Sequence, residues 1–323
     1  MKVALTPACF AGSGGGHVVR CLALARALEA RDAECAFVVE PLGADILARL
    51  GWTGEVAIAD GEVARLSAIH AHEPDATVVD DYRLNASFEA RLPGAVMVID
   101  DLADRPHACA LLLDAAYGRT PTDYAARALN AKILLGPAYA LLRAGFAAPP
   151  RPVLERVERV FVCFGLSDPG GIAARSVCLL RPLAPDAVFD VALGSDAPSV
   201  PALEAMDDPS IRLHLDADVA PLMHAADLGV GAGGGMVWER SAAGLPQLVV
   251  TLADNQRPSA GRLADDGVIA LVDIHDPDFD AKLAESFERL LDSAERRGQI
   301  NRRGADCDGR GANRAAEALL ALC

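Results

Sequence analysis

Short apolar runs rich in β-branched residues alternate along this chain with segments of helical periodicity. Several of the runs are apolar at every position, as expected for strands that helices cover on both faces. This order predicts a parallel α/β sheet, because parallel neighbours need a crossover connection. The predicted strands are Val3–Thr6, Cys35–Val39, Thr77–Val79, Val96–Ile99, Lys132–Leu135, Val160–Phe164, Val188–Leu193, Ile211–Leu215, Leu228–Val230, Gln247–Val250 and Ala270–Val272.

The segments between the strands predict amphipathic helices, because apolar residues recur three and four positions apart. The clearest case is His17–Ala30, where one face carries Val18, Cys21, Leu22, Ala25 and Leu28. Other predicted helices are Ala173–Leu180, Met236–Ala243, Gln256–Asp266 and Ala312–Leu320.

A proline-rich, charged segment at 148–159 interrupts the alternation once, and a new strand follows it. We interpret this segment as a linker between a domain at 1–147 and a domain at 160–304. The remaining residues, 305–323, hold a helix that could pack back onto the first domain. Both domains are predicted to be Rossmann-like and doubly wound, with ligands in a cleft between them at the carboxyl ends of the strands.

The charge of the chain narrows the choice of partner. It has 30 Lys and Arg against 45 Asp and Glu, a formal net charge of −15. A nucleic acid or an anionic membrane surface would repel it, so we expect no nucleic-acid partner and no stable membrane association. A small anionic substrate is still possible if a local positive field binds it. We expect a monomer.

The eight cysteines are widely spaced, without a C-x-x-C pair or a Cys/His set at zinc-ligand spacing. We interpret them as buried apolar residues in a reducing compartment, and we predict no metal and no cofactor. The first residues partly resemble a signal peptide, but Pro7 and the glycines that follow disfavour export. The sequence therefore predicts a soluble, cytoplasmic protein.

A glycine-rich segment, Gly12–Arg20 (GSGGGHVVR), lies between a predicted strand and a predicted helix. Glycines let backbone N–H groups approach a ligand, and a helix N-terminus favours negative charge. The segment is neither a dinucleotide fingerprint nor a P-loop. His17 falls in the first helical turn, where the positive helix end favours a neutral imidazole that can accept a proton. The alternative is a capping or packing role for His17.

Acidic clusters follow two other predicted strands. Asp80, Asp81 and Tyr82 end the first (VVDDYRL), and Asp100 and Asp101 follow the second (VIDDLADRPH). Carboxylates at these positions could polarise a histidine or bind sugar hydroxyls. Aspartates after strands also cap turns and helices, and this alternative stays open for each of them.

The stretch 228–256 gives the strongest indication of a ligand site. A strand enters Gly231–Gly235, a helix carrying Glu239 follows, and another strand leads to Asp254–Gln256. A glycine turn at a helix N-terminus suits a diphosphate, and Glu239 could accept hydrogen bonds from both hydroxyls of a ribose. The alternative is a close helix–strand crossing that needs small residues.

This stretch resembles the nucleotide-binding half of GT-B-fold enzymes that use UDP-sugars. Over 3–272 the chain resembles the PseG family, the UDP-sugar hydrolases of pseudaminic acid biosynthesis. The family's motif blocks occur here in the family's order. They are G-x-G-H-x-x-R-C at Gly14, Gly16, His17, Arg20 and Cys21, D-x-Y at Asp80 and Tyr82, I-D-D-L-A-D-R-P-H at Ile99–His107, G-P-x-Y-A-L-L-R at Gly136–Arg143, F-G-x-S-D-P at Phe164–Pro169, and G-A-G-G…W-E…G-L-P…A-D-N-Q at 231–256.

The resemblance implies hydrolysis of UDP-2,4-diacetamido-2,4,6-trideoxy-β-L-altropyranose to UDP and the free sugar, in a pathway for surface or flagellin glycosylation. It implies that water attacks sugar C1 without a metal, that His17 is the general base, and that Asp80 and Tyr82 orient it. The helices after Gly165–Gly171 and Gly231–Gly235 would hold the diphosphate. The implied UDP-sugar-binding residues are Gly14, Gly15, Gly16, Arg20, Gly165, Ser167, Gly233, Gly234, Gly235, Met236, Glu239, Asn255 and Gln256.

Three residues on the sugar side, Thr6, Ala8 and Ala115, depart from the family pattern and leave the exact sugar open. The alternative function is a GT-B glycosyltransferase that uses the same UDP site and another acceptor. No Lys/Arg cluster marks an acceptor face on the first domain, which favours water. A UDP-sugar-binding protein without catalysis is a third interpretation, and the presence of His17, Asp80 and Tyr82 disfavours it.

Overall fold

The computed structural model describes residues 1–10, 15–149, 152–304 and 306–323. The chain divides into two compact units. Unit 1 comprises Met1–Ala144 and Gly309–Cys323, and unit 2 comprises Gly145–Asp308. Each unit is a Rossmann-like domain with a parallel sheet covered by helices, and the predicted doubly wound α/β class is confirmed.

The sheet of unit 1 has seven parallel strands in the order β3-β2-β1-β4-β5-β6-β7. The order reverses between β1 and β4, and this topological switch point is where such sheets bind ligands. The strands are β1 (Lys2–Pro7), β2 (Glu34–Val39), β3 (Glu55–Ile58), β4 (Ala76–Asp80), β5 (Ala95–Ile99), β6 (Leu111–Asp114) and β7 (Lys132–Leu135).

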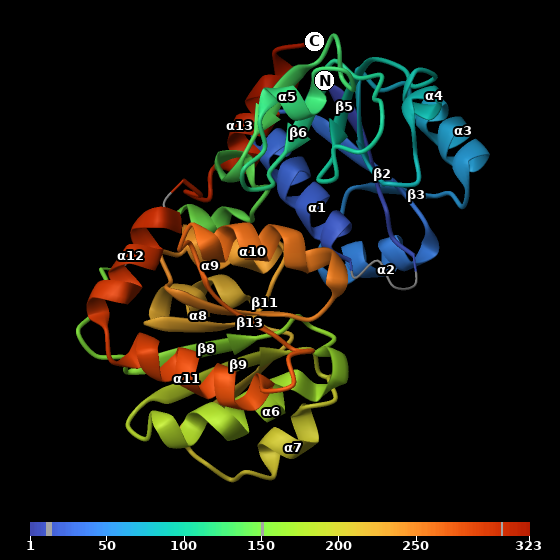
Figure 1. The fold of residues 1–323 in the computed structure, drawn as a ribbon. Helices are drawn as coiled ribbons and strands as arrows, with labels where there is room; N and C mark the ends of the chain where they lie inside the picture. The colour runs from blue at the N-terminus through green and yellow to red at the C-terminus, as the bar shows by residue number, and fades with distance from the viewer. Residues whose placement is uncertain (11–14, 150–151, 305) are drawn as a thin grey trace. The chain divides into compact units, whose positions relative to one another are not determined.

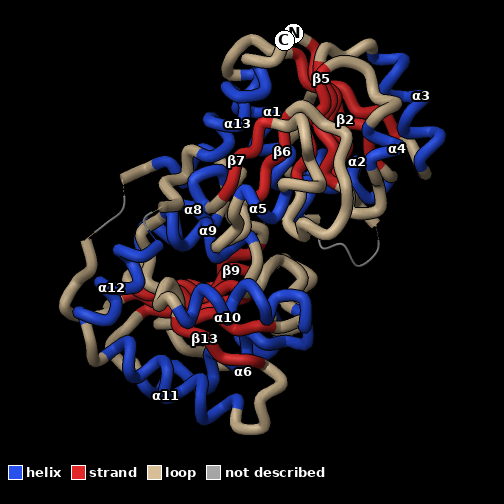
Figure 2. Tube along the Cα trace, turned by 45° about the horizontal axis from the view of Figure 1, so that its top comes forward, coloured by secondary structure: helices blue, strands red, loops and turns tan. Residues whose placement is uncertain are grey.

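Helices cover both faces of this sheet, because alternate strand residues point to opposite sides. Val3 and Leu5 pack with the buried side of α1 in one core, whereas Ala4 joins a second core with residues of α3 and α4. Helix α13 belongs to unit 1 and packs along α1 (Figure 1 and Figure 2). The helices of unit 1 are α1 (Gly16–Glu29), α2 (Pro41–Arg49), α3 (Glu62–His72), α4 (Ala86–Glu89), α5 (Pro121–Tyr124) and α13 (Gly311–Leu320), with the short η1 (Pro137–Tyr139).

The sheet of unit 2 has six parallel strands in the order β10-β9-β8-β11-β12-β13, so its switch point lies between β8 and β11. In Figure 1, α6 and α11 lie on one side of this sheet and α9 and α10 on the other. The strands are β8 (Arg159–Cys163), β9 (Val188–Leu193), β10 (Ile211–Leu215), β11 (Leu228–Ala232), β12 (Gln247–Thr251) and β13 (Ala270–Asp273). The helices are α6 (Ile172–Leu180), α7 (Val200–Glu204), α8 (Val219–Ala225), α9 (Gly235–Ala242), α10 (Arg257–Asp265), α11 (Phe279–Leu291) and α12 (Ala294–Gly304), with the short η3 (Pro169–Gly171), η4 (Arg181–Leu183) and η5 (Asp254–Gln256).

Every predicted strand forms, but sequence analysis missed β3 and β6. Strand β3 is an edge strand whose residues are only half-buried or exposed, so it has no continuous apolar run. Strand β6 reads Leu-Leu-Leu-Asp, and leucine has a high helix propensity. Its place between β5 and β7 makes it a strand, which is a case of tertiary pairing overriding local preference.

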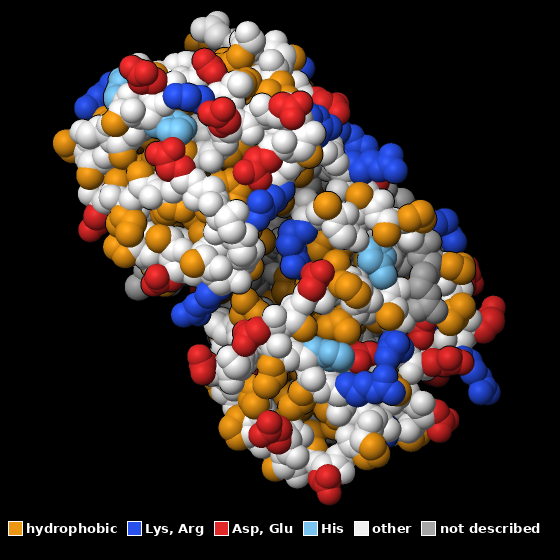
Figure 3. Space-filling view, turned by 180° about the vertical axis from the view of Figure 1, so that it is seen from behind, with side chains coloured by type: hydrophobic (Ala, Val, Ile, Leu, Met, Phe, Trp, Pro, Cys, Tyr) orange, Lys and Arg blue, Asp and Glu red, His pale blue; other side chains and the backbone are white. Residues whose placement is uncertain are grey.

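The surface carries charges of both signs, and Figure 3 shows Asp and Glu side chains spread among Lys and Arg on one face. Over the residues described, no helix combines the length and the apolar character needed to cross a membrane. The prediction that the cysteines are buried is wrong for Cys178 and Cys323, which are exposed. The buried ones are Cys9, Cys21, Cys35, Cys163 and Cys307.

Candidate functional site

The candidate catalytic site lies at the switch point of unit 1. Strands β1 and β4 are parallel neighbours, so their carboxyl ends meet at the same edge of the sheet. Helix α1 starts at Gly16, after Gly15 adopts the left-handed conformation with φ 73°, and Gly15 at the N-cap contributes no side-chain cap. His17 in the first turn of α1 thus reaches Asp80, the last residue of β4.

His17 and Asp80 form a histidine–carboxylate dyad. The imidazole Nδ1 lies 2.7 Å from Asp80 Oδ1, and the His17 side chain is 13% exposed while that of Asp80 is fully buried. An ionised carboxylate can only accept hydrogen bonds, and Arg20 NH2, 3.2 Å from the same Nδ1, makes its shorter bond to Asp80, so Nδ1 is assigned the proton. This tautomer, assigned from the hydrogen-bond network, leaves the Nε2 lone pair of His17 available to accept a proton.

Arg20 fixes the other side of the same carboxylate. Its Nε donates to Asp80 Oδ2 at 2.6 Å and its NH2 to Oδ1 at 2.5 Å, while NH1 donates to Asp101 Oδ2 at 2.7 Å. Burial alone would raise the pKa of Asp80, but Arg20 and His17 lower it to about 2. Asp80 is therefore ionised at neutral pH, and Arg20 acts on the site through two carboxylates.

Tyr82 lies beside the dyad and is held by Asp101. Its ring meets the imidazole of His17 edge-on, with centroids 4.9 Å apart and an interplanar angle of 78°. Its hydroxyl donates to Asp101 Oδ2 at 2.5 Å, and its side chain is 37% exposed. Burial and the charge of Asp101 raise the pKa of Tyr82 far above neutrality. Tyr82 therefore keeps its proton and contacts the imidazole without hydrogen bonding to it.

A buried polar network supports the loop that carries Asp101. The Tyr124 hydroxyl lies 2.9 Å from Asp100 Oδ2 and 2.8 Å from Asp114 Oδ2. Asp100 also accepts from Arg105 NH1 at 2.9 Å and from the N–H of Ala103 at 2.8 Å. Burial is the main factor that raises the pKa of Asp114, which reaches about 6. For Asp100 the alternative that these aspartates organise turns is therefore correct.

The remaining residues of unit 1 that the sequence analysis named include glycines at the start of α1 and two buried residues near the end of β1. Gly14 lies outside the described residues. Gly15 is the N-cap of α1 and Gly16 is its first residue. Thr6 and Ala8, which depart from the family pattern, are buried at 0% and 2% exposure, so these side chains pack within the unit.

The glycines of the strongest motif fall into two groups in unit 2. Gly231 is part of β11, and a Cβ on it would lie 2.0 Å from the carbonyl oxygen of Cys163, so the small-residue alternative is correct for this position. Gly233, Gly234 and Gly235 form the turn into α9, with Gly234 at φ 78° and no side-chain cap. The first N–H groups of an uncapped helix have no intrahelical acceptors and suit an anion.

The helix after the other glycine loop is already capped. Asp168 is fully buried, and its Oδ1 accepts from the N–H of Ala173 at 2.9 Å, while Ser199 Oγ accepts from the N–H of Ala174 at 2.9 Å. A carboxylate and a hydroxyl thus occupy the start of α6. With the N–H groups of Ala173 and Ala174 already bonded, the start of α6 offers fewer donors to an anion than the sequence predicted. Gly165 and the exposed Ser167 precede the capped turn.

Four further predicted residues surround the α9 turn in sequence. Met236 and Glu239 are half-buried in α9. Gln256 Oε1 accepts from the N–H of Leu252 at 3.0 Å and lies 3.3 Å from where a Cβ on Gly233 would be. Gln256 therefore closes its own loop against the glycine turn. Asn255 lies in the 3-10 turn η5, and its side chain is outside the described part.

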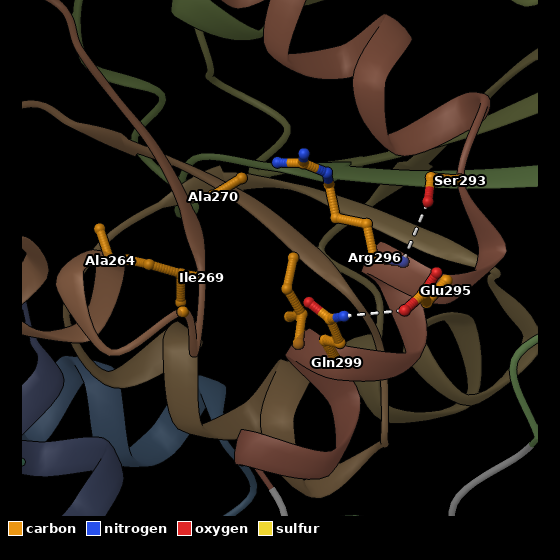
Figure 4. Close-up of a pocket in the computed structure, with 9 residues that line it drawn as sticks. Ala264, Ile269, Ala270, Ser293, Glu295, Arg296 and Gln299 are labelled. Carbon is orange, nitrogen blue, oxygen red and sulfur yellow. Dashed lines mark hydrogen bonds between the residues drawn. The ribbon is translucent and has the colours of Figure 1, made fainter.

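Two cavities lie away from these loops. One cavity, of about 360 Å³, lies in unit 2. It is lined by Ile269 and Ala270 at the start of β13 and by residues of α12 (Figure 4). The other, of about 440 Å³, includes Lys2 and Glu34, where β1 and β2 begin. Both lie at amino ends of parallel strands, opposite to the edge where such sheets bind ligands. No group of three or more His, Cys, Asp or Glu within the described ranges could hold a metal ion.

Asp101 and Arg240 were not among the residues predicted for the site. Asp101, which joins Arg20 to Tyr82, was seen only as one of several acidic residues after a strand. Arg240, next to Glu239 in α9, is completely buried and was not considered. The useful signal for Arg240 was the pair Gly229 and Gly231, because glycines at alternate strand positions make room for a large side chain on one face.

No protein-family profile and no curated protein matches the chain in sequence. Solved structures match it over nearly its whole length. One is CalG4, the calicheamicin glycosyltransferase, with a TM-score of 0.68, 16% identity, and coverage of 99% of this chain and 98% of that one. MurG from Acinetobacter baumannii matches with a TM-score of 0.67, 15% identity, and coverage of 99% and 100%.

A third match is a UDP-GlcNAc 2-epimerase from Neisseria meningitidis bound to UDP-GlcNAc. Its TM-score is 0.64 at 13% identity, with 99% of this chain and 100% of that one covered. At such identities the likeness shows the fold alone, which is the GT-B fold of two Rossmann-like domains.

Proposed function

We propose that the protein is an enzyme that breaks the bond between C1 and the diphosphate oxygen of a UDP-linked sugar, with His17 as general base. The observation that carries the proposal is the contact of His17 Nδ1 with the buried Asp80, which leaves Nε2 to accept a proton. Solved structures with the same fold include glycosyltransferases and a UDP-GlcNAc 2-epimerase, which supports a nucleotide-sugar substrate.

In the proposed reaction, His17 Nε2 takes the proton of a hydroxyl nucleophile as its oxygen bonds to sugar C1. The bond from C1 to the diphosphate breaks, and its electron pair leaves with UDP. Asp80 stabilises the imidazolium that forms, and Arg20 keeps Asp80 in place. Within unit 2, we propose the backbone N–H groups of the glycine turn into α9 as the group that binds a diphosphate.

Two nucleophiles fit this chemistry. The glycosyltransferases among the solved structures support transfer to an acceptor hydroxyl. The ordered motifs that resemble the PseG family support water as the nucleophile, with UDP-2,4-diacetamido-2,4,6-trideoxy-β-L-altropyranose as the substrate. We propose this hydrolysis as the finer assignment and acceptor transfer as the alternative, which the experiment below distinguishes.

The test is to incubate the protein with UDP-sugars, including that substrate, and to follow UDP release and the sugar anomer by NMR, with and without acceptor alcohols. His17→Asn should lower kcat by about 10²–10⁴ while UDP still binds. His275→Asn changes an exposed histidine and serves as the control. Release of UDP only with an acceptor would replace hydrolysis by transfer, and full activity of His17→Asn would contradict the base assignment.

A further inference from the structure

Arg240 is a buried arginine whose hydrogen bonds go only to uncharged groups. Its side chain has 0% exposure. Its Nε donates to Gln247 Oε1 at 2.8 Å and its NH2 to the carbonyl oxygen of Ala232 at 2.6 Å, while NH1 is buried without a hydrogen-bond partner. A buried guanidinium that forms no ion pair among the described residues is costly to a fold, and the charge of Glu239 offsets only part of the effect of burial on its pKa.

The guanidinium of Arg240 stays positively charged although it is buried. Burial lowers the pKa of Arg240 to about 10, so the side chain is still protonated at neutral pH. The amide of Gln247 is itself held by the carbonyl oxygen of Val237 at 3.2 Å and by Ser241 Oγ at 3.0 Å. The guanidinium is therefore fixed in position and cannot turn away to find water.

The guanidinium lies at the end of β11, directly before the glycine turn. A Cβ on Gly229 would lie 2.8 Å from Arg240 Cδ, and one on Gly231 would lie 2.9 Å from NH1. The arginine thus runs along the two strand glycines, and NH2 holds Ala232, the residue that precedes Gly233. The guanidinium is thus bonded to the strand end from which the glycine turn into α9 begins.

We propose that Arg240 is a positioning residue that attracts the diphosphate of the substrate to the α9 turn and stabilises charge on the departing UDP. It does so as a fixed buried charge, without needing to touch the phosphates, because electrostatic attraction is stronger in a poorly solvated interior than in water. This inference rests on the proposed function, since it assumes that a nucleoside diphosphate binds at the turn.

The experiment measures how ligand affinity depends on ligand charge. Kd values for UDP, inorganic pyrophosphate and uridine are determined by calorimetry for the wild type, Arg240→Met and Arg240→Lys. Arg240→Met should weaken UDP about tenfold or more and change uridine less than about twofold, whereas Arg240→Lys should retain most of the UDP affinity. Arg297→Met is the matched control.

Arg297 is also buried in unit 2, at 1% exposure, and its hydrogen bonds among the described residues likewise go to uncharged acceptors, here backbone carbonyls that include those of Leu154 and Leu291. It lies in α12, so its loss should leave the ratio of UDP to uridine affinity unchanged. If Arg240→Met weakens the affinities for UDP and uridine equally, or changes neither, the inference is overturned. UDP binding by the wild type would still support the proposed function. A wild type that binds neither UDP nor pyrophosphate contradicts both.

If Arg240→Met does not fold, NMR of arginine-labelled wild type replaces it. The guanidinium signal of Arg240, assigned by its loss in Arg240→Lys, should shift with UDP and stay in place with uridine. If the signal does not shift with UDP, or shifts equally with uridine, the proposed electrostatic role of Arg240 is contradicted.

Discussion

Asp80 Oδ1 accepts a hydrogen bond from His17 Nδ1 at 2.7 Å, although the two residues are 63 positions apart in the chain. The contact depends on the sheet order, which makes β1 and β4 neighbours and brings the start of α1 to the end of β4. The contact between His17 and Asp80 is thus a direct product of the doubly wound topology.

Asp80→Asn should reduce kcat by about 10²–10⁴ with little change in the Kd of UDP. An amide can donate to Nδ1 and so favours the tautomer in which Nε2 carries the proton. Thermal unfolding must be measured as well, because Arg20 loses part of its carboxylate pairing. A variant that folds and retains wild-type kcat would show that the dyad does not orient the base.

Tyr82→Phe should have a smaller effect than the loss of His17. The substitution removes the hydrogen bond to Asp101, worth about 1 kcal/mol, but keeps the ring that contacts the imidazole. We expect kcat to fall about tenfold, with an unchanged pH profile between pH 6 and pH 9, because the pKa of Tyr82 lies far above this range. A fall as large as that of His17→Asn would instead make Tyr82 part of the proton transfer.

His107 should make stability depend on pH on the alkaline side. Burial opposes its charge, but Asp100 and Glu89 raise its pKa to about 9, and Nδ1 lies 2.8 Å from Glu89 Oε1. A raised histidine pKa stabilises the folded state fully below the unfolded pKa of about 6.5, and this contribution is lost as pH rises through about 9. Its upper limit is about 3 kcal/mol.

Urea unfolding of the wild type and His107→Gln at pH 6, 7.5 and 9.5 measures this contribution. The stability difference between the two proteins should be largest at pH 6 and should shrink toward pH 9.5. A difference that is constant over this range would mean that folding does not raise the pKa of His107.

Thiol labelling should distinguish Cys178 from the buried cysteines. Cys178 is exposed on α6, whereas burial raises the pKa of Cys163 to about 11 and that of Cys35 to about 12. In native protein at pH 8, iodoacetamide should alkylate the exposed Cys178 and Cys323, and Cys35 and Cys163 only after unfolding. Mass spectrometry with Cys178→Ser as control checks this. Equally fast alkylation of Cys163 would contradict its burial.

Local patterns were sufficient to predict the strands with continuous apolar runs and the helix that carries His17. They were insufficient for β6, whose leucines favour a helix until its neighbours pair with it. The motifs pointed to His17, Asp80 and Tyr82, and the structure brings these three together.

The partners of these residues required the structure. Arg20 was expected to bind substrate, yet its nitrogens are taken by Asp80 and Asp101, a pairing between segments far apart in sequence. The capping of α6 by Asp168 likewise depends on a left-handed residue with φ 41°, which no local pattern predicts. Sequence identifies reactive residue types well, but it does not say which polar groups already satisfy one another.

The packing of α13 along α1 has a consequence for biosynthesis. Ala315, Ala316 and Leu319 are fully buried in the core that contains Val3 and Leu5, and Arg31 NH1 donates to Asn313 Oδ1 at 2.9 Å. A ribosome translates all of unit 2 before it reaches this helix. The chain of unit 2 is therefore complete before that of unit 1. The core beside the His17 site gains its last helix only when α13 has left the ribosomal exit tunnel.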